Sequence, residues 1–137
     1  MSLVFFDTNI LVYTEDARVP DKQRKATRLV EDHWLDDTAV LSLQVLQEYF
    51  ATVTQKLNAP LERAQRRVEI FAAAKVVHFE ARDIIAAIEL HRLAHMSFWD
   101  ALIVHAARIS GAAVLYSEDF QHGAAVAGVR VVNPFLA

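Results

Sequence analysis

Short apolar runs alternate with longer amphipathic segments along this chain, and this alternation restricts its fold more than any other feature of the sequence. A short run of mainly apolar residues is typical of a strand that is buried on both faces. Such runs predict five strands, at Leu3–Phe6, Ala39–Leu41, Lys75–Phe79, Ala112–Tyr116 and Val129–Val132.

The segments between the runs have the periodicity of helices. They predict helices at Asp21–Leu35, Leu43–Leu57, Leu61–Ala74, Ala81–His95 and Phe98–Ile109. Parallel strands need long crossover connections, so this order predicts an α/β fold with a largely parallel sheet and helices on both faces. Ligand sites of such sheets lie beyond the carboxyl ends of the strands.

The composition fits one domain over residues 1–137, because 54% of the residues are hydrophobic and only 23% are charged. The chain has no cysteine, which excludes disulfides, thiolate metal sites and cysteine nucleophiles. No apolar run approaches the ~18 residues of a membrane span, so we expect no membrane partner and a cytoplasmic location. A formal charge of −3 argues against binding nucleic acid through bulk positive charge.

Two aspartates directly follow predicted strands. Asp7 ends the first apolar run, and Asp119 follows the fourth in Ser117-Glu118-Asp119. Aspartate in this position often forms a turn or caps the next helix, and this explanation applies to both residues. If the two strands are neighbours in a parallel sheet, both carboxylates also lie at one edge, where ligands bind.

Two further acids fall on predicted helices. The helical wheel places Glu48 beside the apolar stripe of its helix, which favours a solvated acid. Its place early in that helix also allows it to lean over the carboxyl edge of the sheet. Asp100 shares a helix face with Ile103 and Val104, so a buried, partnered carboxylate competes with a capping box that begins at Ser97.

Four carboxylates in one pocket require cations. At a separation of about 5 Å, each pair repels by about 3 kcal/mol at an effective dielectric of about 20. Carboxylate oxygens favour Mg²⁺ or Mn²⁺ over Zn²⁺, and such ions promote the hydrolysis of phosphodiesters. Without these four acids the formal charge is +1 rather than −3, so a polyanion would meet a neutral to mildly basic surface.

Two basic stretches lie on predicted helices and allow two interpretations. Their residues are Lys22, Arg24, Lys25 and Arg28 in the first, and Arg63, Arg66 and Arg67 in the second. Either stretch can contact phosphates. Acids at helical spacing, such as Glu62 four residues before Arg66, favour salt-bridged helix surfaces instead.

The motifs together resemble the PIN-domain family, in particular the VapC-type toxins of toxin–antitoxin modules. The resemblance spans nearly the whole chain and is carried by Asp7-Thr8-Asn9, Ser42 with Gln47-Glu48, Ser97-Phe98-Trp99-Asp100-Ala101 and Leu115-Tyr116-Ser117-Glu118-Asp119. It implies a three-layer α/β/α fold with a five-stranded parallel sheet. It also implies a Mg²⁺- or Mn²⁺-dependent endoribonuclease with an acidic cluster of Asp7, Glu48, Asp100 and Asp119, supported by Thr8, Asn9 and Ser117.

The resemblance further implies several partners. These are an RNA substrate, a cognate antitoxin, a second copy in a homodimer, and DNA that is reached only through the antitoxin. Two alternatives stay open on the sequence: a PIN nuclease that processes RNA without being a toxin, and a PIN module that binds nucleic acid without catalysis.

Overall fold

Six strands form a single sheet in the computed structural model, which describes residues 2–136. The strands are β1 (Val4–Phe6), β2 (Ala39–Ser42), β3 (Lys75–Val77), β4 (Val114–Tyr116), β5 (Ala125–Val126) and β6 (Val129–Val132). Their order across the sheet is β3-β2-β1-β4-β6-β5. All neighbouring pairs are parallel except β5 with β6, which is antiparallel.

Strand β5 corrects the expected number of strands from five to six and adds one antiparallel pair to the largely parallel sheet. It has only two residues, too few to form an apolar run that the sequence would reveal. A tight turn joins β5 to β6, and its two residues, Ala127 and Gly128, have φ values of 51° and 83°. Positive φ at both positions is the requirement of a type I′ hairpin turn, so this edge of the sheet ends in a hairpin.

Six helices connect the strands. They are α1 (Thr8–Tyr13), α2 (Pro20–Leu35), α3 (Leu43–Gln55), α4 (Leu61–Phe71), α5 (Ala81–Ala94) and α6 (Phe98–Ser110). Five of them match the predicted helices to within three residues at each end. Helix α1 was not predicted, because six residues are too few to display a helical period.

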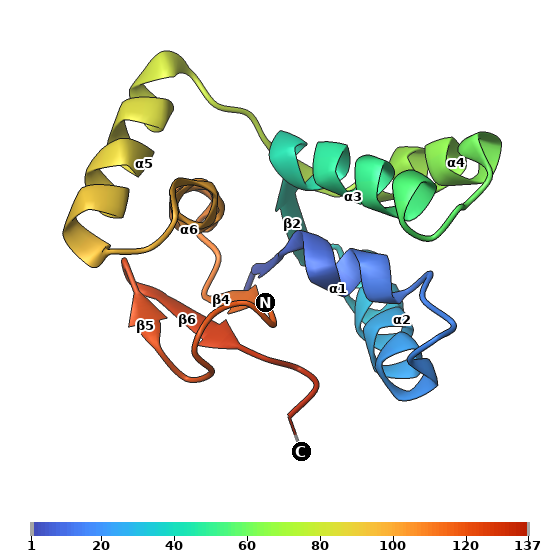
Figure 1. Ribbon diagram of the computed structural model, residues 1–137. Coiled ribbons are helices and arrows are strands. Elements are labelled where there is room, and N and C mark those ends of the chain that lie inside the picture. Colours follow the sequence, from blue (N-terminus) through green and yellow to red (C-terminus); the bar gives the residue numbers. More distant parts are fainter. Residues whose placement is uncertain (1, 137) are drawn as a thin grey trace.

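Helices cover both faces of the sheet (Figure 1). Helix α6 lies on one face with α5 outside it, and α2 lies on the other face. Phe6 of β1 packs edge-on against Trp34 of α2, with 5.2 Å between the ring centroids. The neighbouring Phe5 points to the opposite face, because side chains alternate along a strand, and both rings are fully buried. The three-layer α/β/α fold is therefore confirmed.

Strands β1 and β4 lie side by side where the chain switches from one half of the sheet to the other. Phe6 pairs in register with Tyr116, so Asp7 and Ser117 leave the sheet at the same level. The Asp7 amide donates a hydrogen bond to the Tyr116 carbonyl oxygen at 3.0 Å. In parallel sheets, a ligand crevice forms outside the strand ends at such a switch point.

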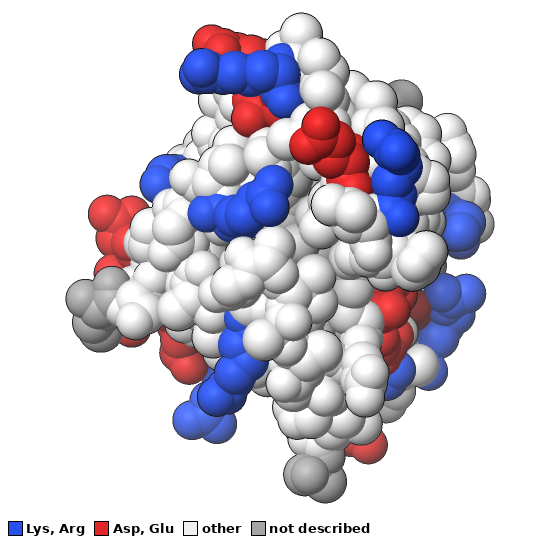
Figure 2. All heavy atoms as spheres, turned by 90° about the vertical axis from the view of Figure 1, so that its left-hand side faces the viewer, with Lys and Arg blue, Asp and Glu red and all other residues white. Residues whose placement is uncertain are grey.

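The side of the molecule on which α5 lies carries charges of both signs (Figure 2). Acidic and basic groups are interspersed there around a broad uncharged area, and neither sign dominates. Helix α5 exposes the large apolar side chains of Ile84, Ile85 and Ile88. Within residues 2–136, no helix has the length and apolar character needed to cross a membrane.

Candidate active site

Asp7 caps a helix and belongs to the site at the same time. It follows β1, and its Oδ1 accepts a hydrogen bond from the Thr8 amide at 2.7 Å at the start of α1. Its Oδ2 accepts a hydrogen bond from the Ser117 hydroxyl, also at 2.7 Å. Only 4% of Asp7 is exposed. Capping and participation in the site, which the sequence presents as alternatives, are therefore compatible.

The loop that follows β4 carries Asp119. Fully buried Ser117 links this loop to Asp7, and its Oγ also accepts a hydrogen bond from the Asp119 amide at 3.1 Å. Asn9 Oδ1 accepts a hydrogen bond from the Glu118 amide at 3.3 Å. Asn9 and Ser117 thus fix the main chain around Asp119.

Glu48 lies in the second turn of α3, which begins directly after β2 with Ser42 as its cap. Its Oε1 accepts a hydrogen bond from the Thr8 hydroxyl at 2.7 Å. Glu48 is therefore half-buried in the cleft lining, rather than fully solvated as the helical wheel alone favours. The wheel fails because helix α1, which the sequence pattern does not reveal, packs beside α3 and brings Thr8 to Glu48.

Asp100 lies in the first turn of α6, where the Ser97 hydroxyl accepts a hydrogen bond from its amide at 3.1 Å. Ser97 thus caps the helix. The Asp100 side chain is half-buried and lies beside Ile103 in the lining of the cleft. Helix α6 leads into β4 and runs antiparallel to it, so α6 begins at the carboxyl edge of the sheet.

All four acids line one cleft of about 520 Å³ at the carboxyl edge of the sheet. Thr8 and Asn9 line it as well, whereas Ser117 lies behind Asp7. Other lining residues escaped the sequence analysis, among them Gln44, Thr52 and Lys56. These three lie at steps of four residues from Glu48 along one flank of α3. Their spacing would have revealed them once that flank was known to face the site.

The acids of the cleft influence one another electrostatically. The pKa of Asp7 is raised to about 7, mainly because burial disfavours the charged form. Hydrogen bonds from Ser117 and Thr8 oppose this rise, and the charges of Asp119 and Glu48 add to it. Burial also raises the pKa of Asp100, with a further contribution from the charge of Asp119.

The donor set fits a hard divalent cation. The acids offer oxygen atoms only, which suit Mg²⁺ or Mn²⁺, and a nearby positive charge would favour the charged form of Asp7 and so offset the effect of burial on its pKa. Among the residues that the structure describes, no three acidic or histidine side chains lie close enough together to hold an ion directly. Mg²⁺ usually keeps several waters and takes one or two carboxylates, so these acids would hold it partly through water.

Comparison with known proteins decides the family. A model of the PIN domain matches residues 4–126. The chain belongs to the PIN-domain family. The match covers β1 to β5 and includes all four acids of the cleft. No curated protein is significantly similar to the chain.

Solved structures with the same PIN fold include several toxin–antitoxin proteins. A toxin–antitoxin complex from Klebsiella pneumoniae aligns with a TM-score of 0.70 and 20% identity, over 96% of this chain and 98% of that chain. VapBC2 from Rickettsia felis, bound to a promoter DNA fragment, aligns at 0.68 and 21% identity, over 94% and 96%. The sarcin–ricin loop cleaving toxin VapC20 from Mycobacterium tuberculosis aligns at 0.63 and 23% identity, over 85% and 89%. At these sequence identities, the similarity to the three structures shows a shared fold only.

Proposed function

We propose that this PIN domain is a Mg²⁺- or Mn²⁺-dependent endoribonuclease that acts as the toxin of a toxin–antitoxin module. The observation that carries the proposal is a single cleft lined by carboxylates from four separate parts of the chain. Such a concentration of negative charge repels a nucleic acid unless cations occupy it. The sarcin–ricin loop cleaving toxin VapC20, which shares the fold, supports RNA as the substrate.

Asp7, Glu48, Asp100 and Asp119 would hold one or two divalent cations. When bound, such ions lower the pKa of a water molecule and neutralise charge on the phosphodiester. The protein holds the carboxylates in place before substrate arrives, since Ser117 and the Thr8 amide fix Asp7 and the Thr8 hydroxyl fixes Glu48. Fixed groups of this kind need no reorganisation during the reaction. Hydrolysis breaks the bond between phosphorus and the 3′-oxygen and leaves a 5′-phosphate and a 3′-hydroxyl.

Lys56 is the cationic member of the cleft lining that the structure describes. We assign it to a phosphate of the RNA. Replacing Lys56 by Met should raise KM several-fold with little change in kcat, and should reduce the slope of log affinity against log salt by about one. Cleavage rates and RNA affinity at several salt concentrations measure both effects. Arg66→Met, on the exposed surface of α4, is the matched control. An unchanged salt slope would contradict the assignment.

The proposed partners follow from the same comparisons and from the surface. Toxin–antitoxin complexes with this fold support an antitoxin partner, and VapBC2 on promoter DNA supports indirect contact with DNA through that partner. The exposed isoleucines of α5 support a homodimer, since apolar groups of this kind favour protein interfaces. We place the protein in the cytoplasm, where its RNA targets are found.

The proposal is tested by incubating the full chain with end-labelled single-stranded RNA. We expect cleavage with Mg²⁺ or Mn²⁺, none after addition of EDTA, and products with 5′-phosphate ends. RNA binding without cleavage would favour the non-catalytic alternative, and cleavage in EDTA would contradict a metal-dependent mechanism. A toxin should also arrest growth on expression, and the product of an adjacent gene should relieve the arrest. Cleavage without growth arrest would favour an RNA-processing nuclease.

A further inference from the structure

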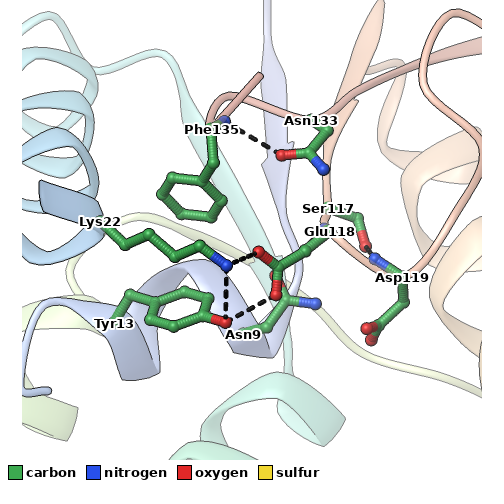
Figure 3. Close-up of polar contacts among 8 residues, drawn as sticks. All are labelled: Asn9, Tyr13, Lys22, Ser117, Glu118, Asp119, Asn133 and Phe135. Carbon is green, nitrogen blue, oxygen red and sulfur yellow. Dashed lines mark hydrogen bonds and ion pairs between the residues drawn. The ribbon is translucent and has the colours of Figure 1, made fainter. Parts of the chain in front are cut away.

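Glu118 precedes Asp119 but points away from the acidic cleft. Its side chain extends toward α1 and α2, whereas the Asp119 carboxylate points in another direction (Figure 3). The Tyr13 hydroxyl donates a hydrogen bond to Glu118 Oε1 at 2.6 Å. Lys22 Nζ forms an ion pair with Glu118 Oε2. Tyr13 of α1 and Lys22 of α2 therefore hold the side chain of Glu118, which directly precedes the candidate metal ligand Asp119.

Lys22 is itself held in place by aromatic rings. Its Nζ lies 4.9 Å from the centroid of the Tyr13 ring and 5.4 Å from that of the Phe135 ring. It also donates a hydrogen bond to the Tyr13 hydroxyl at 3.4 Å. The two rings pack edge to face, 5.0 Å apart. Attraction between an ammonium group and aromatic faces makes this lysine a better-ordered partner for Glu118 than a solvated lysine would be.

The position of Asp119 depends on what holds its loop, because its own side chain has no partner among the described residues. Its residue is exposed, and within residues 2–136 no hydrogen bond or ion pair fixes its carboxylate. The main chain of the loop therefore sets which positions this carboxylate can reach. The amides of Glu118 and Asp119 in this loop donate hydrogen bonds to Asn9 Oδ1 and Ser117 Oγ, and the side chain of Glu118 attaches the loop to α1 and α2.

We propose that Lys22 and Tyr13 are positioning residues of the active site, which act through Glu118 to direct the Asp119 carboxylate toward a divalent cation. The inference rests on the proposed function. It assigns Lys22 a positioning role instead of the phosphate contact that is one interpretation of its basic stretch. The ion pair also neutralises Glu118, so its carboxylate stands beside Asp119 without adding net charge there.

The test compares Lys22→Met with Arg24→Met in the full chain. Both substitutions remove one cation from α2, but Arg24 pairs with exposed Asp21 and does not contact the loop. Mn²⁺ affinity, measured by electron paramagnetic resonance of free Mn²⁺ without RNA, should fall about tenfold in Lys22→Met. This is the lower end of the loss expected when a direct partner of a metal ligand is removed, because Lys22 acts on the residue next to the ligand. Arg24→Met should bind Mn²⁺ as the parent does.

Two further variants separate positioning from folding. Glu118→Gln retains an acceptor for Tyr13 and removes only the ion pair, so it should fold and show the same loss of Mn²⁺ affinity. The exchange of charges in Lys22→Glu with Glu118→Lys should restore at least half of the affinity lost in Lys22→Glu alone. A general structural defect would not be rescued in this way.

The outcomes distinguish this inference from the proposed function. Equal Mn²⁺ affinities of Lys22→Met and Arg24→Met would overturn the inference while leaving a cleaving parent protein as a nuclease. A higher KM for RNA with unchanged Mn²⁺ affinity would overturn it as well, and would assign Lys22 to a phosphate. A parent protein that neither binds Mn²⁺ nor cleaves RNA would overturn the proposed function and this inference together.

Discussion

Replacing Asp7 by Asn should reduce metal-dependent RNA cleavage at least about a hundredfold, the range expected when a fixed charged group of an active site is lost. Asn keeps the size of the side chain and an oxygen that can accept the Thr8 amide. Its amide nitrogen can donate to Ser117 Oγ, which in the parent donates to Asp7. The substitution therefore removes the negative charge while preserving the cap of α1.

Asp37→Asn is the matched control for this prediction. Asp37 is exposed, lies outside the cleft and has a φ of 57°, a conformation that Asn also adopts readily. Initial cleavage rates at saturating Mg²⁺ and Mn²⁺ should be unchanged in this control. Cleavage by Asp7→Asn at a rate within a few-fold of the parent would show that Asp7 has no part in the chemistry.

The metal-free protein should become less stable as the pH rises from 5 to 7.5, and Asp7→Asn should remove most of this loss. The pKa of native Asp7 is about 7, against about 4 in an unfolded chain. Between these values the native state holds a proton that the unfolded state has released, so the free energy of unfolding falls with rising pH. At about 1.4 kcal/mol for each pKa unit, the full effect is up to about 4 kcal/mol.

Urea unfolding in EDTA measures this effect. Asp7→Asn should be more stable than the parent, and the difference should be about 2–3 kcal/mol larger at pH 7.5 than at pH 5. The comparison of the two proteins is necessary because burial lowers the pKa of His33, which acts in the opposite direction in the same pH range. A difference that is equal at both pH values would contradict the raised Asp7 pKa. Mg²⁺ should restore stability to the parent at pH 7.5.

The order of strands and helices could be predicted from the sequence because both leave local patterns. The apolar run before Asp7 and the run before Ser117 show where two strands end, and a parallel arrangement brings such ends to one edge. Asp7 and Asp119 could be placed near this edge from their neighbours in the chain alone. The position of Glu48 could not, since the helical wheel describes one helix and contains no information about what packs against it.

The missing elements were short. Helix α1 and strand β5 have six and two residues, and no periodicity is visible at these lengths. Helix α1 nevertheless presents both Thr8 and Tyr13 to the site, so its omission hid the contacts of Glu48 and of Glu118.

The sequence by itself determined the α/β class, the alternation of strands with helices and the acids that end β1 and β4, because each follows from residues adjacent in the chain. Only the tertiary structure decided which side chains meet in the cleft. Thr8 binds Glu48 across 40 positions, and Lys22 binds Glu118 across 96. Contacts over such separations depend on how whole elements pack, and periodicity within each element does not record that packing.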